Sequence, residues 1–424
     1  MISRPALLLA MIVVAGLGAC NEKLDGGAAC PSLCPAQSVP VQDTLITPVL
    51  AFDSTYVGFP PRGTESSMLL ATRGDTLEVR GIVRFDSLTY AFSPPSDTSR
   101  LITRVDSSRV RLHLLLAGAK LPANVRFEVY DVDTVAADTA SAPVLATFRR
   151  DRLIGTLTLP KAAVIDTIFI PLSDSAVLSK LAARTRLRLG FRVDGDGPVS
   201  IRAQNTASGL AASLSYRPSP DTAVHALTVS PYSSTPTDFD VLRGDLTNFT
   251  LVAKYGLGFD PNDLAVGGVP GRRGYLRFDI PRRIADSATV VRATLQLTQR
   301  SLPFGDADTV TIWAQLVLAS PLVTDLRVAS NLLATQGLYV TDSLLTVPRD
   351  SGVKEIEMNG AVRAWAAQAR LTTGPPPPPR AIVLRMSPEG VLPGEVRFYS
   401  SRGPVDKRPR LRVSYVPKVT FGVP

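Results

Sequence analysis

An arginine and an aspartate that flank a phenylalanine occur twice in this 424-residue chain and are its first candidates for a chemical role. The first pair is Arg84 and Asp86, and the second is Arg277 and Asp279. Such a carboxylate could bind a ligand or take part in catalysis. An aspartate that directly follows a strand can instead accept hydrogen bonds from turn backbone, or pair with an arginine on a neighbouring strand. We favour this structural role and interpret both triplets as landmarks of a repeated unit.

Common catalytic signatures do not occur in the sequence, which has no G-x-S-x-G elbow, H-E-x-x-H motif, Walker loop or dinucleotide fingerprint. Its two histidines are His113, within an alternating strand pattern, and His225, within a linker. Neither is expected to act as a general base. Paired carboxylates can hydrolyse glycosides without histidine. A carbohydrate-active enzyme with carboxylates in an inter-domain cleft is therefore the alternative to a protein that is not an enzyme.

Two short acidic loops are the candidates for binding a cation. Asp194 and Asp196 lie in the first loop, and Asp306 and Asp308 lie in the second. Calcium prefers six to eight oxygen ligands, and neither stretch supplies the carboxylates of a complete EF-type loop. We predict polar turns and no cofactor, with a structural calcium ion as the weaker alternative.

A binding function would need exposed aromatic or arginine side chains. Tyrosines near predicted turns could stack on a sugar, and arginines could hold an anionic polymer through forked hydrogen bonds. The plainer interpretation of these arginines is that they are solvated on an arginine-rich surface. The candidate ligand contacts are Tyr232, Tyr255, Tyr339, Arg272, Arg273 and Arg402.

The net charge of +9 is scattered along the chain and forms no basic run. Nucleic acid is therefore excluded as the expected partner, whereas a polysaccharide or an envelope protein is compatible with this charge.

The elements that must position these residues are predicted to be strands. Apolar residues alternate with polar ones in stretches such as Val110–Leu114, Val125–Val129 and Leu187–Phe191. This period of two is typical of strands with one buried and one solvated face. Clusters of Pro, Gly, Asp and Ser separate the strands, and helical periodicity is scarce. The fold class is therefore predicted to be all-β, with sandwich or barrel packing.

The same ordered series of features occurs in both halves of the chain, which indicates an internal repeat. The first half contains VRFD, RVRLHL, VRFEVYDV, TIFIPL, a helical stretch, RLRLGF, VSIRAQ and LSYRP. The second contains LRFD, ATLQL, VTIWAQLVL, VKEIEM, a helical stretch, AIVLRM, EVRFYS and VSYVP. Leu181 and Trp365 are predicted to occupy the same inward position on the two short helices. These features predict two tandem domains, at 45–218 and 227–417.

The second half resembles the DNRLRE domain, which is named for a disaggregatase-related family. The resemblance is carried by YLRFDIP, SATVVRATLQL, VKEIEMNGAVRAWA, RFYSSR and PRLRVSYVP, and the first half looks like a degenerate copy. It implies that each domain is an antiparallel, jelly-roll-like β-sandwich with one short helix. It also implies a place in secreted or surface proteins, where some related modules bind carbohydrate, including acidic polysaccharide.

The amino terminus has the pattern of a signal peptide, with Arg4 followed by an apolar run too short to span a bilayer comfortably. Leu17-Gly18-Ala19-Cys20 is similar to the lipobox of bacterial lipoproteins, which implies cleavage after residue 19 and lipidation of Cys20. Residues 20–44 would form the tether. Cys30 and Cys34 are expected to pair in an oxidising compartment, with free thiols as the alternative.

These observations together predict an exported protein, anchored by lipid to a bacterial membrane and in particular to the outer membrane. Its expected role is non-catalytic binding or structure, directed towards a polysaccharide, with an architectural part in an envelope assembly as a further alternative.

Overall fold

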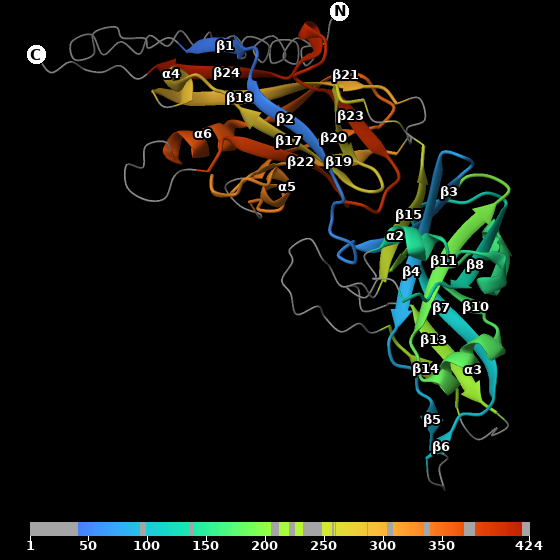
Figure 1. Ribbon diagram of the computed structural model, residues 1–424. Helices are drawn as coiled ribbons and strands as arrows, with labels where there is room; N and C mark the ends of the chain where they lie inside the picture. The colour runs from blue at the N-terminus through green and yellow to red at the C-terminus, as the bar shows by residue number, and fades with distance from the viewer. Residues whose placement is uncertain are drawn as a thin grey trace, which may run out of the picture.

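The computed structural model describes residues 41–93, 99–135, 140–204, 212–219, 225–231, 248–256, 258, 260–285, 287–302, 308–334, 340–368 and 378–417. Antiparallel strands dominate these residues and form two large sheets (Figure 1). The predicted all-β class is confirmed. The signal peptide and the candidate residues Cys20, Cys30, Cys34, Tyr232, Tyr339 and Asp306 lie outside the described residues.

The first sheet has 11 strands and is built mainly from the first half of the chain. Its strand order is β14-β13-β7-β12-β3-β4-β11-β8-β9, while β10 pairs with β7 and β15 pairs with β4. The bounds of these strands are β3 (Ser67–Arg73), β4 (Leu77–Phe85), β7 (Val105–Lys120), β8 (Asn124–Asp131), β9 (Leu153–Pro160), β10 (Thr167–Pro171), β11 (Leu187–Gly195), β12 (Val199–Gln204), β13 (Ser213–Pro218), β14 (Leu227–Val229) and β15 (Asn248–Tyr255).

The second sheet also has 11 strands, in the order β1-β24-β18-β23-β16-β17-β22-β19-β20, while β2 pairs with β17 and β21 pairs with β18. The bounds are β1 (Gln42–Ile46), β2 (Leu50–Val57), β16 (Asp263–Gly267), β17 (Arg272–Phe278), β18 (Ala288–Arg300), β19 (Val310–Leu316), β20 (Val340–Thr346), β21 (Gly352–Glu357), β22 (Ala381–Ser387), β23 (Glu395–Tyr399) and β24 (Arg410–Pro417).

Short elements complete the described part of the fold. A separate two-stranded sheet pairs β5 (Ala91–Phe92) with β6 (Arg100–Leu101). The α-helices are α2 (Ser141–Leu145), α3 (Asp174–Ala183), α4 (Arg282–Ala285), α5 (Leu326–Ala329) and α6 (Asn359–Gln368). The 3-10 helices are η1 (Arg150–Arg152), η2 (Lys161–Ala163) and η4 (Val405–Lys407). None of the helices in these described ranges has the length and apolar character needed to cross a bilayer.

The two sheets have the same strand order, position by position. For example, β4 and β17, which carry the two RFD triplets, occupy the same place in their sheets. The off-path strands also correspond, because β10 on β7 matches β21 on β18, and β15 on β4 matches β2 on β17. The recurring features of the sequence therefore lie on equivalent strands.

The leading strands of each half, however, lie in the sheet of the other half. β1 and β2 begin the first half but pair with β24 and β17. β14 and β15 begin the second half but pair with β13 and β4. In Figure 1 the blue β1 and β2 accordingly lie among the yellow-to-red strands, and the yellow β15 lies beside the blue β4. The predicted limits 45–218 and 227–417 follow the sequence repeat, but they do not describe which strands share a sheet.

One hydrogen bond occurs at the same place in both sheets and supports this correspondence. Thr250 of β15 lies opposite Gly81, and its hydroxyl accepts a hydrogen bond from the Leu69 backbone N–H at 3.0 Å. Thr55 of β2 lies opposite Gly274, and its hydroxyl accepts from the Ala265 backbone N–H at 3.0 Å. The exchanged strands are therefore attached by equivalent contacts.

Each sheet encloses its own hydrophobic core, as the alternating patterns require. Leu181 of α3 is buried in the first core and Trp365 of α6 in the second, at the predicted inward positions. The Trp365 ring packs against Phe278 with the ring centroids 5.3 Å apart. The side chain of Ser173 caps α3 by accepting from the Ala176 N–H.

The two RFD triplets differ in their surroundings. Arg84 is buried, and its Nε lies 2.8 Å from a carboxylate oxygen of Asp86. Arg277 and Asp279 are exposed, with the Arg277 guanidinium over the Phe52 ring of β2. The backbone N–H of Asp279 donates to the Val49 carbonyl. The triplets thus occupy equivalent strand ends, but the arginine of the first copy pairs with the aspartate, whereas the arginine of the second copy lies over an aromatic ring.

Candidate functional site

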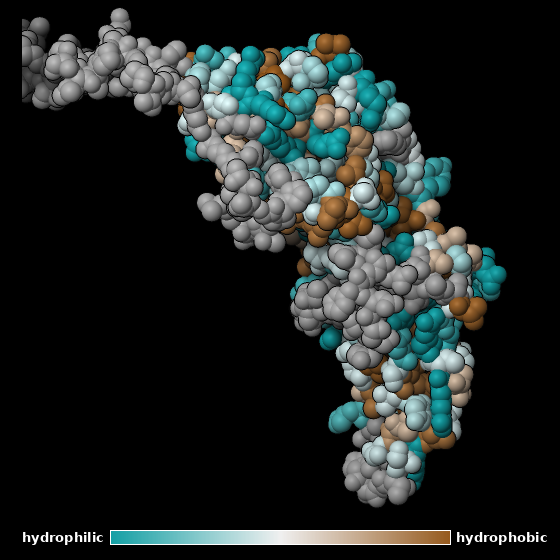
Figure 2. All heavy atoms as spheres, turned by 60° about the vertical axis from the view of Figure 1, so that its left-hand side comes forward, coloured by the Kyte–Doolittle hydropathy of each residue, from teal (hydrophilic) through white to brown (hydrophobic). Residues whose placement is uncertain are grey.

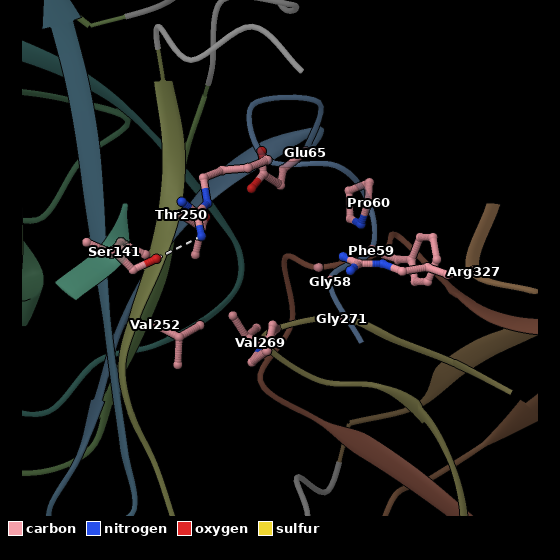
Figure 3. Close-up of a pocket in the computed structure, with 14 residues that line it drawn as sticks. Gly58, Phe59, Pro60, Glu65, Ser141, Thr250, Val252, Val269, Gly271 and Arg327 are labelled. Atoms are coloured by element: carbon pink, nitrogen blue, oxygen red, sulfur yellow. Dashed lines mark hydrogen bonds between the residues drawn. The ribbon is translucent and has the colours of Figure 1, made fainter. Parts of the chain in front are cut away.

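A pocket of about 410 Å³ lies where the two sheets meet, which we call the junction pocket. Segment 58–66, which joins β2 to β3, forms part of its wall, and β15 and the loop between β16 and β17 form much of the rest. Figure 3 shows Thr250 and Val252 facing Phe59, Pro60 and Arg327 across this space. Because the wall includes the exchanged strand β15 and segment 58–66, which follows the exchanged strand β2, the pocket depends on the exchange.

Two glycines allow segment 58–66 to pack against the second sheet. The backbone N–H groups of Gly58 and Phe59 both donate to the carbonyl of Gly271, at 2.9 and 3.1 Å. A Cβ atom at position 271 would lie 1.8 Å from the Phe59 carbonyl oxygen, so only glycine fits there. Gly58 has φ +98°, a conformation that glycine adopts readily, and a Cβ atom added there would lie 2.7 Å from Nη2 of Arg327.

Two arginines give the junction pocket its positive charge. Arg62 donates from Nη2 to the Ser141 hydroxyl at 2.9 Å (dashed line in Figure 3), and its guanidinium lies over the Phe249 ring. Burial lowers the pKa of the Arg62 guanidinium, and the neighbouring Glu65 partly offsets this effect. Arg327 follows Asp325, whose side chain caps α5, and it lines the opposite side of the pocket. An anionic group in the pocket would therefore lie between two guanidinium groups.

Glu65 is the carboxyl group among the described residues that line this pocket, and its side chain is buried. It accepts a hydrogen bond from the Gly63 backbone N–H. Burial raises the pKa of Glu65 to about 7, because desolvation of the carboxylate outweighs its backbone hydrogen bonds and the nearby Arg62. The pocket therefore gains a negative charge as the pH rises through neutrality.

Arg272 and Arg273, two of the expected ligand contacts, are buried rather than solvated, with 7% and 6% of their surfaces exposed. Arg272 donates to the Glu395 carboxylate. Arg273 makes a two-pronged pair with Glu389, at 2.6 and 2.7 Å, and its guanidinium lies 4.2 Å from the centre of the Phe59 ring. The physical reason for the difference is that acidic partners far along the chain, Glu395 of β23 and Glu389 of the loop before it, compensate both charges inside the protein.

Tyr255, another expected ligand contact, joins the two sheets. It ends β15 in the first sheet, and its hydroxyl donates to the Glu395 carboxylate of β23 in the second. Arg272 donates to the same hydroxyl at 3.0 Å, and its guanidinium lies over the tyrosine ring. Burial raises the pKa of the Tyr255 hydroxyl, which keeps it a donor at neutral pH. The structure therefore places Tyr255 in an internal network of the junction.

Arg402 is exposed and lines a second pocket of about 500 Å³ on the second sheet, together with Asp260, Asp263 and Arg300. Its Nε donates to the Pro261 carbonyl at 2.9 Å. Hydrogen bonds from the Asn262 N–H and Arg300 lower the pKa of Asp260, whereas burial raises that of Asp263. Arg300 donates to both carboxylates, so the charges of this pocket are largely compensated.

The expected cation ligands have other partners. Asp196 accepts hydrogen bonds from the Asn124 backbone and side chain, and these bonds lower its pKa. Asp194 accepts from the Gly195 N–H, and Asp308 lies 2.9 Å from Lys120 across the two sheets. Within the described ranges, no three His, Cys, Asp or Glu side chains gather in a way that could hold a metal ion.

The expected histidines lie away from the junction pocket. His113 of β7 faces Thr167 of β10, with Nδ1 3.2 Å from the threonine hydroxyl, and His225 lies just before β14. Burial lowers the pKa of His113. Figure 2 shows hydrophilic and hydrophobic residues intermixed over the visible face, so surface polarity alone does not mark a site. The junction pocket is distinguished instead by its place between the two sheets, from which its lining residues come.

Sequence reasoning did not identify Arg62, Glu65 or Arg327. These residues lie in non-periodic or very short elements, and they come together only because the leading strands are exchanged. No protein-family model matches this chain, and no curated protein matches it.

Proposed function

We propose that the protein is a non-catalytic, lipid-anchored protein of a bacterial envelope or surface that binds an acidic polysaccharide in the junction pocket. The observation that carries this proposal is the placement of Arg62 and Arg327 around a pocket of about 410 Å³. Small-molecule sites are typically about 300 to 1,000 Å³. The hydroxyls of Ser141 and Thr250 add polar groups suited to a sugar, and Phe59, Leu251 and Val269 add apolar surface.

The proposal also includes the type of sandwich that each sheet forms and the family to which the chain is related. Each sheet would be a jelly-roll-like sandwich that is completed by the leading strands of the other half, and the chain would be a divergent relative of the DNRLRE modules. The resemblance of YLRFDIP and VKEIEMNGAVRAWA to those modules supports this view. It also supports carbohydrate as the ligand class, while the two guanidinium groups favour an acidic sugar.

Binding of an acidic oligosaccharide should be detectable by calorimetry with a trimer of galacturonic acid. Arg327→Gln should weaken it about tenfold, because one charged hydrogen bond is lost. The matched control is Arg402→Gln, which removes an exposed arginine of the second pocket. Binding that is lost in Arg402→Gln and kept in Arg327→Gln would contradict the assignment to the junction pocket, as would equal binding of a neutral galactose trimer.

The same binding should weaken as the pH rises from 5.5 to 8.5. Glu65 is protonated and neutral below its pKa of about 7 and becomes a carboxylate above it, while the sugar acid stays ionised throughout. The added negative charge beside the ligand opposes binding only at the higher pH. Glu65→Gln should therefore flatten the pH dependence, and an unchanged profile in that variant would contradict the role of Glu65.

Membrane anchoring is tested separately. Cys20→Ala should shift the protein from the detergent-soluble membrane fraction to the aqueous fraction in cells, because the lipid would be the anchor. Replacement of Cys30 and Cys34 by serine provides the control and should leave fractionation unchanged. Membrane association of Cys20→Ala would refute the lipid anchor without affecting the proposal for the pocket.

The enzymatic alternative has a specific candidate in the second pocket, where Asp263 has a raised pKa and Asp260 a lowered one. Such a pair could supply a general acid and a base. We favour binding because Arg300 donates hydrogen bonds to both carboxylates. Its positive charge stabilises their ionised forms and would oppose protonation of the one that must act as the acid. Release of reducing ends by the purified protein, abolished by Asp263→Asn, would establish the enzyme instead.

A further inference from the structure

The two halves of the chain are interlocked rather than simply joined. Residues 42–218 supply nine strands of the first sheet and two of the second, and residues 227–417 supply the converse. The covalent connection between these halves is segment 219–226. The strand pairings between the halves are non-covalent, and each half supplies the two strands that the sheet of the other half lacks.

The donated strands pair with strands of the other half over most of their length. β2 pairs with β17 from Arg272↔Val57 to Phe278↔Leu50, and β1 pairs with β24 over five residues. Asp53 of β2 has 2% of its surface exposed and accepts hydrogen bonds from the backbone and hydroxyl of Ser401. Phe249 and Leu251 of β15 are buried in the first half. A half without its partner would leave these positions open.

A second copy of the chain offers the same complementary half. Every strand pairing between residues 42–218 and 227–417 is non-covalent, so the same pairings can form between two chains. We propose that two copies exchange halves, so that residues 42–218 of each copy interlock with residues 227–417 of the other in a closed dimer. The junction and its pocket would be rebuilt in duplicate, each from two chains.

Concentration decides between the single chain and the dimer. Segment 219–226 keeps the two halves of one chain near each other at an effective concentration in the millimolar range that is typical of short linkers. Exchange should therefore be rare in dilute solution and should rise when the chain folds among closely spaced copies. Because β2 and β15 place buried residues in the other half, we expect exchange to occur during folding and to be retained afterwards.

Disulfide trapping distinguishes the two arrangements in the full-length chain with Cys20, Cys30 and Cys34 replaced by serine. Leu45 of β1 and Arg412 of β24 are paired in register and exposed, so cysteines at both positions can cross-link the donated strand. One tagged chain carries Leu45→Cys alone and another carries Arg412→Cys alone. The two are unfolded, mixed, refolded together at about 10 µM or about 500 µM, and oxidised. A disulfide between the two tags then requires strand exchange.

We expect the fraction of mixed-tag disulfide to rise at least tenfold between these concentrations. The control pair combines Leu45→Cys with Leu322→Cys, an exposed position outside the strands of the second sheet, and reports random collisions. A chain with both Leu45→Cys and Arg412→Cys shows by its internal cross-link that the variants fold. Mixed-tag disulfide no greater than in the control pair at about 500 µM, with this internal cross-link formed, would overturn the proposal.

Discussion

Replacing Glu395 by glutamine should lower the free energy of unfolding by about 3 to 5 kcal/mol, the range observed when one partner of a buried ion pair is removed. The Glu395 carboxylate is 1% exposed and accepts hydrogen bonds from Arg272, from Arg397 Nε at 2.6 Å and from the Tyr255 hydroxyl. Glutamine keeps the shape but removes the charge. Two buried guanidinium groups would then lack their shared compensating carboxylate, and the link from β15 to β23 would weaken.

Urea unfolding followed by circular dichroism measures this effect. Glu355→Gln is the matched control, because Glu355 is exposed on β21 and accepts a hydrogen bond from Gln296. Its replacement should change stability by less than about 0.5 kcal/mol. If the two glutamine variants were equally stable, the charge of Glu395 would not hold the junction together.

The strands were predictable from the sequence because their signal is local. A strand with one buried face needs an apolar residue at every second position, as in Val110–Leu114, whichever strand becomes its neighbour. The inward positions of Leu181 and Trp365 followed from a similarly local pattern on short helices. The order of features in the two halves also anticipated that they would occupy equivalent strands.

The exchange of leading strands was not predictable, because the repeat makes both docking positions locally equivalent. Thr55 and Thr250 make the same hydrogen bond opposite equivalent glycines, so the sequence of β2 does not distinguish β4 from β17 as its neighbour. The choice depends on the junction, where segment 58–66 packs on Gly271. Such contacts join residues that are far apart in the chain.

The candidate site was also not predictable from the sequence, because its residues are brought together from distant parts of the chain. Arg272 and Arg273 looked like surface arginines, since their partners Glu395 and Glu389 are more than one hundred positions away. Arg62 and Glu65 lie in an irregular segment without periodicity, which carries no signal of burial. Tyr255 was singled out for its place near a turn, but its position at the end of an exchanged strand gives it internal partners instead.

Gly271→Ala should destabilise the protein by at least about 4 kcal/mol, an exceptional value for one methyl group. The added Cβ would lie 1.8 Å from the Phe59 carbonyl oxygen, a backbone atom that no side-chain rotation can move away. Relief would require segment 58–66 to leave the second sheet. That movement would break the two hydrogen bonds from Gly58 and Phe59 to the Gly271 carbonyl and would expose the Phe59 ring stacked on Arg273.

Gly258→Ala is the matched control for this prediction, because no atom lies within 4 Å of the Cβ that would be added there. Its effect on urea unfolding should be within about 1 kcal/mol, with stabilisation the expected direction, since alanine restricts the unfolded chain. A Gly271→Ala variant as stable as Gly258→Ala would mean that segment 58–66 is not clamped against β17. Because the same segment lines the junction pocket, loss of the clamp should also abolish binding of the galacturonic acid trimer under conditions in which the variant remains folded.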